Sequence, residues 1–339
     1  MLHELKTIIS HARALQRKGL KSILATVVDL DGSSYRKPGV RMLITEDGQM
    51  IGAVSGGCVE RDVFQQAGSV FKEGIPKVMT YDGRYRLGCE GLLYILIEPL
   101  EVSDAFYEAF MTNIETRADL QMTTAFEKRE TTAAAYGTQV VFNKAEVFGL
   151  RKAYRPAVDN RLKIFSQTLK PCFRLFIFGG EHDAIKLCAM ASLLGWEVQV
   201  ICSETNPKTL RDFPGATAVT AQVPELMDLS IDGDTAVVLM NHNYVRDLKY
   251  VLQLERLRPR YIGILGSRKR REKLIDDLFK HKPDFDLDML DHIYSPAGLH
   301  IGSVTPEEIA LAILSEILAV YRGITPESLR NRSASKIKK

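Results

Sequence analysis

The sequence predicts an α/β protein of two domains, an N-terminal α+β domain followed by a doubly wound parallel sheet. The length of 339 residues suits two domains of roughly 100–200 residues each. Apolar residues make up 45% and charged residues 26% of the chain, as in ordinary globular proteins. Before residue 145 strand-like runs follow one another across short turns, whereas after residue 171 they alternate with helical segments. Such alternation is typical of a parallel sheet with helices on both faces.

The N-terminal domain is predicted over residues 1–145. Leu2, Leu5 and Ile8 recur at helical spacing until Gly19 stops the pattern, so the domain begins with a helix. Runs rich in Ile, Leu and Val then predict strands, and helical periodicity returns twice. We expect helices at 2–18, 58–72 and 103–116, strands at 22–29, 40–45, 77–81 and 92–98, and a peripheral hairpin of 120–126 with 139–142.

Residues 146–170 are predicted to form a basic connector between the domains. From 143 to 170 the hydrophobic pattern becomes irregular, and this stretch holds seven Lys or Arg residues against two acids. Irregular polar segments between patterned ones usually run over the surface. We therefore expect most of the connector to lie on the surface.

The C-terminal domain is predicted over residues 171–330. It opens with an apolar run that ends in Gly179-Gly180, and strand-like and helical segments then alternate. Thr305, Pro306 and Glu308 supply an N-cap, a first-turn proline and a capping-box acid for the last helix. We expect strands at 172–178, 197–202, 216–220, 235–240 and 261–265. We expect a helical segment after Gly179-Gly180 that ends at 194, and helices at 244–257, 269–280 and 309–321.

Composition argues against several classes of function. The formal net charge is only +3, which indicates neither a nucleic-acid partner nor a membrane partner. No apolar run approaches the roughly 18–20 residues of a membrane span, and the charged N-terminus does not resemble a signal peptide. The five cysteines are scattered without a CxxC pair, which suits a reducing compartment. We therefore expect a cytoplasmic protein.

A first candidate site lies in glycine-flanked segments of the N-terminal domain. Glycines permit close backbone approach, and a helix N-terminus favours anions and lowers the pKa of a cysteine placed there. One of the segments lies where a strand ends and a helix begins, and an arginine offers a cation to the same anion. These features predict a pocket for a phosphorylated, thiol-reactive or metal-bearing ligand. Its residues are Ser33, Ser34, Arg41, Ser55, Gly56, Gly57, Cys58 and Cys89.

A structural interpretation competes with this one. The glycines would then only turn the chain, and Cys58 and Cys89 would be small buried hydrophobic residues. No His or acid stands at metal-ligand spacing from either cysteine, so we do not expect a structural zinc site.

A second candidate site is the first strand-to-helix turn of the C-terminal domain, with Gly179, Gly180 and His182. The turn follows the dinucleotide pattern G-x-G-x-x-A at its first and last positions but has Glu181 at the second glycine. A carboxylate there repels a pyrophosphate. The next strand ends in Cys202 without the acid that would bind a ribose. The turn therefore predicts a nucleotide-type fold but makes NAD(P) a doubtful cofactor.

A third candidate site lies on later turns of the same predicted sheet. Ser267 can cap a helix whose free N–H groups, together with Arg268, would hold a phosphate at the carboxyl edge of the sheet. Structural interpretations compete with this one. Residues 268–271 would then be a solvated helical face, and His242 and His182 would serve as structural hydrogen-bonding groups. The residues of this site are His242, Asn243, Gly266, Ser267 and Arg268.

Taken in order, these motifs resemble the XdhC/CoxI family of xanthine dehydrogenase accessory proteins. The resemblance covers residues 20–325. It rests on Gly32-Ser33-Ser34 with Gly39 and Met42, Ser55-Gly56-Gly57-Cys58-x-Glu60, Gly88-Cys89, His242-Asn243, Leu265-Gly266-Ser267-Arg268, and 296–302 before Thr305-Pro306-Glu307-Glu308.

The resemblance implies an N-terminal XdhC/CoxI domain, a C-terminal Rossmann-like domain and a molybdenum cofactor chaperone. Such a protein binds molybdopterin, assists its sulfuration together with a cysteine desulfurase, and delivers it to an apo molybdenum hydroxylase of the xanthine dehydrogenase type. Cys58 or Cys89 would then contact molybdenum or relay sulfur. Two domains joined by a connector are also compatible with a homodimer.

Two other functions stay open on the sequence alone. The first is an NAD(P)-dependent oxidoreductase with His242 as acid or base. It is favoured by the fold alone, and a fold does not determine a function. The second is a non-catalytic docking protein whose sites have decayed, which is consistent with Glu181 and Glu90. The sequence does not decide whether the chain is itself an enzyme.

Overall fold

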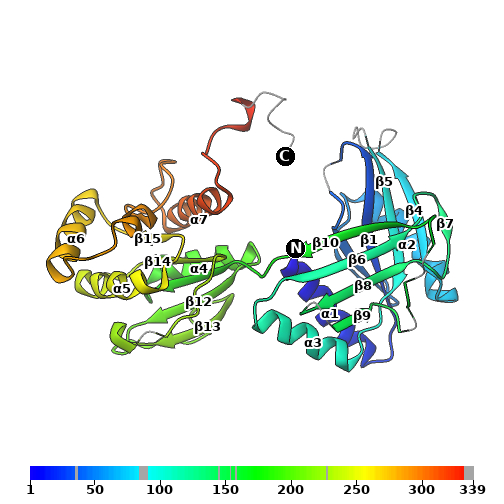
Figure 1. Cartoon of the computed structure of the whole chain (residues 1–339), viewed down its shortest axis with the longest axis horizontal. Helices are drawn as coiled ribbons and strands as arrows, with labels where there is room; N and C mark the ends of the chain where they lie inside the picture. The colour runs from blue at the N-terminus through cyan, green and yellow to red at the C-terminus, as the bar shows by residue number, and fades with distance from the viewer. Residues whose placement is uncertain are drawn as a thin grey trace. The chain divides into compact units, whose positions relative to one another are not determined.

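The computed structural model describes residues 1–34, 37–83, 91–143, 146–152, 154–156, 159–226 and 228–331, apart from the side chains of Cys58 and Leu226. The chain divides into two compact units, Met1–Pro171 and Cys172–Lys339, which we call unit 1 and unit 2 (Figure 1). Within this described part, no helix is both long and apolar enough to cross a membrane.

Unit 1 contains two antiparallel sheets, counted over the described residues. The larger sheet has the strand order β3-β2-β1-β5-β4-β7 and the smaller one the order β10-β6-β8-β9. The strands are β1 (Ser22–Gly32), β2 (Arg41–Thr45), β3 (Met50–Gly52), β4 (Lys77–Asp82), β5 (Gly91–Pro99), β6 (Leu120–Phe126), β7 (Thr131–Thr132), β8 (Gly137–Phe142), β9 (Glu146–Gly149) and β10 (Lys163–Leu169), and the helices are α1 (Leu2–Gln16), α2 (Cys58–Glu73) and α3 (Asp104–Glu115).

Both faces of the larger sheet are buried. On one face α2 packs Val59, Val63 and Ala67 into a core with β1, β2, β4 and β5. On the other face Phe126 and Tyr136 of the smaller sheet and its turn pack against β1, β4 and β5, and α1 contacts β2. Each fully buried aliphatic or aromatic side chain of this kind stabilises the fold by roughly 1.5–3 kcal/mol. The result is a layered α+β unit, as the sequence predicts.

Unit 2 is built on one parallel sheet with the order β13-β12-β11-β14-β15-β16 among its described strands. The order runs outward in both directions from the β11–β14 pair, so the sheet is doubly wound. The strands are β11 (Arg174–Phe178), β12 (Glu197–Cys202), β13 (Ala216–Ala221), β14 (Thr235–Leu239), β15 (Ile262–Ile264) and β16 (Ile293–Tyr294), the helices are α4 (His182–Leu193), α5 (Tyr244–Leu257), α6 (Arg268–His281) and α7 (Pro306–Arg322), and short 3-10 helices cover Pro224–Leu226, Leu287–His292 and Leu329–Asn331.

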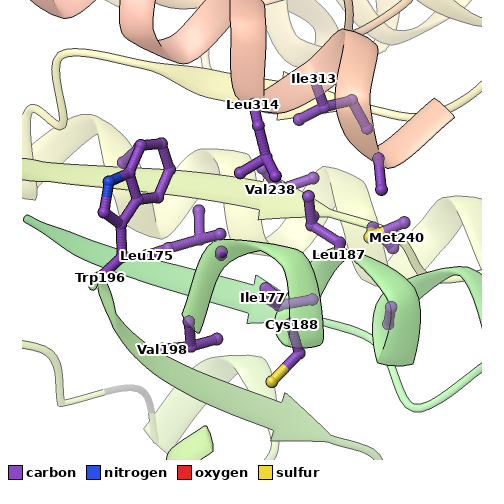
Figure 2. Packing of buried hydrophobic residues seen from close by; sticks show 14 of the residues in the cluster. Leu175, Ile177, Leu187, Cys188, Trp196, Val198, Val238, Met240, Ile313 and Leu314 are labelled. Carbon is purple, nitrogen blue, oxygen red and sulfur yellow. The ribbon is translucent and has the colours of Figure 1, made fainter. Parts of the chain in front are cut away.

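Helices cover both faces of this sheet. Figure 2 shows Leu187 and Cys188 of α4 and Ile313 of α7 packed over strand residues such as Ile177 and Val238. The opposite face packs against α5 and α6 in a second core. The predicted fold class is therefore confirmed. The predicted start of α7 is confirmed as well, because Thr305 and Glu308 form the capping box and Pro306 is the first helical residue.

The stretch expected as a connector needs a correction. Within 146–170 lie β9 and β10, and β10 pairs with β6 along its whole length, from Lys163 opposite Phe126 to Leu169 opposite Leu120. The expected hairpin of β6 and β8 is consequently the middle of a sheet rather than a peripheral element. β10 is an edge strand whose side chains are mostly exposed, so its sequence carries little hydrophobic alternation.

Candidate functional site

The glycine-flanked segments of unit 1 run toward one end of the larger sheet. Gly32 at the end of β1 pairs with Gly91 at the start of β5, and Gly52 at the end of β3 pairs with Met42. The chain leaves β1 through Ser33 and Ser34 and enters α2 through 55–57. The structure thus directs these predicted residues toward the same end of unit 1.

Arg41 does not present its charge to that end, which corrects the sequence-based expectation. Its side chain is only 8% exposed. One terminal nitrogen donates to the Gly39 carbonyl at 2.8 Å, while Nε and Nη2 are buried without a hydrogen-bond partner. Burial lowers the pKa of Arg41 to about 10, although the charges of Glu98 and Glu4 favour its protonated form. Arg41 is therefore a buried cation of the sheet face.

The N-terminus of α2 already faces a carboxylate. The helix begins at Cys58 after Gly57, which has a φ of 78°. Glu60 bends back so that its Oε1 accepts the Ser55 N–H at 2.7 Å, and its Oε2 is buried without a partner. The Ser55 amide is thus not free for an anion. The signal that could have found this contact is the acid three residues after the N-cap.

The two candidate cysteines are placed unequally. Cys58 is the first residue of α2, and Cys89 lies outside the described residues. The cysteines of unit 2 lie elsewhere in its fold: Cys188, for example, is buried, and that burial raises the pKa of its thiol to about 11. Across the residues that the structure describes, no group of three His, Cys, Asp or Glu side chains is placed to hold a metal ion.

The first turn of unit 2 brings two strand ends into contact. Gly179 follows β11 with a φ of 142°, and a Cβ atom there would lie 2.8 Å from the Met240 carbonyl oxygen after β14. Only glycine fits this close approach. Glu181 is the N-cap of α4 without a side-chain capping bond, and His182 is the first helical residue, exposed to solvent. An exposed acid therefore stands at the start of α4.

The end of β12 differs from a ribose-binding strand. Cys202 is buried, and its Sγ donates to the Thr220 carbonyl and accepts the Lys208 N–H, both at 3.3 Å. The nearest acid, Glu204, forms an ion pair with Arg246. The side chain at the end of the strand is thus buried and hydrogen-bonded within the unit.

The later turns carry two capped helices at the carboxyl edge of the sheet. Asn243 caps α5 by accepting the Arg246 N–H at 3.1 Å, and Ser267 caps α6 by accepting the Arg270 N–H at 3.4 Å. His242 is exposed beside the first cap. Arg268 is 89% exposed and pairs only loosely with Glu272 at 3.6 Å. Its charge is therefore available to solvent and ligands.

Arg270 is the cation that sequence reasoning missed at this edge. Its Nη2 lies 2.5 Å from Oδ2 of the buried Asp247 and donates to the Asn241 carbonyl at 3.4 Å. Asn241 also donates to Oδ1 of Asp247 at 2.9 Å. The Arg270 side chain crosses Gly266, where a Cβ atom would lie 2.5 Å from its Cδ. This network ties the start of α5 to the start of α6.

The strand order, the glycine at the β11 turn and the capped helices at the carboxyl edge define unit 2 as a Rossmann-type domain. In agreement, the family model described as the XdhC Rossmann domain matches residues 175–317. The model described as the XdhC and CoxI family matches residues 15–82 in unit 1. The chain belongs to the XdhC and CoxI family.

Relatives of known name are similar over nearly the whole chain. A protein of Bacillus subtilis named as a probable xanthine dehydrogenase subunit is 29% identical over 90% of this chain and 94% of its own. "Molybdenum cofactor insertion chaperone PaoD" of Escherichia coli is 23% identical over 93% and 88%. A crystal structure described as a xanthine dehydrogenase from Bacillus halodurans is 26% identical, with a TM-score of 0.75 over 96% of this chain and 97% of that one.

Proposed function

We propose that this chain is an accessory protein that binds the molybdenum cofactor and delivers it to a molybdenum hydroxylase of the xanthine dehydrogenase type. The observation that carries the proposal is its similarity, along nearly its full length, to one relative named for xanthine dehydrogenase and another named for molybdenum cofactor insertion. Such a cofactor carries a phosphate, a flat ring system and a metal with soft ligands, and the chain offers groups suited to each.

The phosphate is assigned to the N-terminus of α6. Ser267 caps this helix, the exposed guanidinium of Arg268 lies in its first turn, and Arg270 holds the turn against α5. Charge-assisted hydrogen bonds from arginine suit phosphate oxygens. The other proposed contacts in unit 2 are Gly179, Gly180, His182, His242, Asn243 and Gly266, and those in unit 1 are Ser33, Ser34, Ser55, Gly56 and Gly57.

The soft metal contact is assigned to Cys58 or Cys89, since thiolates are the ligands that soft metal centres prefer. Cys58 is the first residue of α2, and helix N-termini in general favour the thiolate form of a cysteine. A thiolate in that position could also relay sulfur received from a cysteine desulfurase. In this scheme the apo hydroxylase and the desulfurase are the protein partners, and a second copy of the chain is a further one.

The test combines ligand identification with activation of a client enzyme. Mass spectrometry of small molecules released from protein purified out of a molybdenum-replete host should find a molybdopterin species. Cys58→Ala and Cys89→Ala should lower its occupancy and the activation of an apo molybdenum hydroxylase, whereas Cys172→Ala, the matched control, should change neither. Wild-type occupancy and full activation by both variants would refute the thiol role, and an empty wild-type protein would refute cofactor binding.

A further inference from the structure

A cavity of about 440 Å³ opens at the carboxyl edge of the unit 2 sheet, outside the residues assigned above except for Gly266. This volume falls within the roughly 300–1,000 Å³ of small-molecule sites. It is too small for a folded segment of a partner protein. The cavity is bordered by the end of β15, the loop 296–303 and the first turns of α7: Leu265, Gly266, Pro296, Ala297, Gly298, Leu299, His300, Ile301, Gly302, Ser303, Ile309 and Ala312.

The chemistry of the lining selects an uncharged ligand group. As far as the described residues go, the lining contains no Lys, Arg, Asp or Glu side chain. Its larger side chains are aliphatic, among them Leu265, Leu299 and Ile309, and burying a charged group against them would be unfavourable. His300 and Ser303 add hydrogen-bonding groups at the rim. The Ser303 hydroxyl donates to the Glu308 carbonyl at 3.1 Å, which leaves its oxygen able to accept.

The wall of the cavity is held in place before any ligand arrives. The Gly298 N–H donates to Oε2 of Glu316 at 2.9 Å, and the Tyr261 hydroxyl donates to the same oxygen at 2.6 Å. The Leu299 N–H donates to the Ala312 carbonyl at 3.2 Å. Gly298 has a φ of 108°, and a Cβ atom there would lie 3.1 Å from that of Ala312. Glycines in this wall let a planar group approach the backbone closely.

We infer that this cavity binds the uncharged, flat heterocycle of a ligand whose phosphate lies at the neighbouring start of α6. Gly266 lines the cavity and directly precedes Ser267, so the ring and phosphate subsites are adjacent in the chain. The inference rests on the proposed function for the phosphate position, but the ring subsite stands on the cavity itself. Two kinds of molecule share this chemistry, a phosphorylated pterin and a reduced nicotinamide mononucleotide.

The test measures binding of both probes to the full chain by their fluorescence. One probe is 6-hydroxymethylpterin phosphate and the other is reduced nicotinamide mononucleotide. Ile301 lines the cavity and is 52% exposed, so Ile301→Glu places a charge on its wall and Ile301→Trp fills its mouth without threatening the core. Both variants should weaken binding at least tenfold. Leu311→Glu is the matched control, because Leu311 is 48% exposed on α7 outside the lining and should shift the dissociation constant less than twofold.

The outcomes separate this inference from the proposed function. If the wild type binds a probe and the Ile301 variants bind it equally well, or Leu311→Glu weakens it as much, the ring subsite is refuted while cofactor binding stands. If only the nicotinamide probe binds, and does so through Ile301, the ring subsite is supported and the pterin assignment fails. If neither probe binds the wild type, the ring subsite is refuted, and recovery of a molybdopterin species from purified protein then decides the proposed function separately.

Discussion

The replacement Glu98→Gln should make the stability of unit 1 less sensitive to pH. Glu98 lies in β5 with no solvent exposure. Its Oε2 accepts the Thr138 N–H at 3.0 Å, and its Oε1 accepts the Thr138 hydroxyl at 2.5 Å, which links the two sheets of the unit. Burial raises the pKa of Glu98 from 4.5 to about 7, although the Thr138 hydrogen bonds and the charges of Arg151 and Arg41 act in the opposite direction.

The sign of the effect follows from where the proton is held. Between pH 4.5 and 7 the folded protein keeps the Glu98 proton while the unfolded chain has released it, so the free energy of unfolding falls as the pH rises through this window. At about 1.4 kcal/mol for each pH unit between the two pKa values, the group destabilises the ionised protein by about 3 kcal/mol. A neutral glutamine removes this term and can still accept the Thr138 N–H.

The assay is denaturant unfolding of the full chain from pH 4.5 to 8.5. Trp196, the only tryptophan of the sequence, is buried in unit 2, so its fluorescence follows that unit, while circular dichroism follows both. From pH 4.5 to 8.5 the unfolding free energy of unit 1 should rise by about 3 kcal/mol in Glu98→Gln relative to the wild type, and that of unit 2 should not change. Glu108→Gln, an exposed site on α3, is the control. A difference that stays constant with pH would refute the reasoning.

Two further substitutions test the carboxyl edge of unit 2. Gly179→Ala should lower the unfolding free energy of this unit by more than about 1 kcal/mol, because φ is positive and a Cβ atom would lie 2.8 Å from the Met240 carbonyl oxygen. The loss is measured as a lower denaturation midpoint of the Trp196 fluorescence, and an unchanged midpoint would contradict the contact. Arg270→Ala leaves the buried Asp247 without its cation and should lower the unfolding free energy of the unit by about 1–3 kcal/mol. Arg271→Ala is the control, and equal losses in the two variants would show that the network is not formed.

Sequence reasoning succeeded where a local signal and the final environment agree. The start of α7 is fixed by Thr305, Pro306 and Glu308 within one helical turn, and the structure has that capping box. The alternation of strands and helices after residue 171 likewise predicted the parallel sheet, because β11, β14 and β15 are short buried apolar runs that are each followed by a helix. Glycines such as Gly179 were placed correctly, since the strand end and the helix start define the turn.

It failed where the environment is set by residues far away in the chain. Arg41 stands in a glycine-rich motif that suggests an exposed cation, but its strand is covered on both faces. Because side chains alternate along a strand, Arg41 and Met42 lie on opposite faces of the sheet, and both are buried. β10 is found only through its pairing with β6, about 40 residues earlier in the chain. Arg270 is one of four consecutive basic residues, and its position around the axis of α6 is what directs its side chain across Gly266. No local pattern distinguishes it from its neighbours.

The positions of the carboxylates rank the predicted anion sites. A helix N-terminus carries about half a positive charge. A carboxylate placed there carries a full negative charge, so the net interaction with a second anion is repulsive. At α2 that charge is Glu60, which takes the Ser55 amide, and at α4 it is Glu181 at the N-cap. The start of α6 has a serine cap and no acid in its first turn. The phosphate of a ligand should therefore prefer the start of α6 to the starts of α2 and α4.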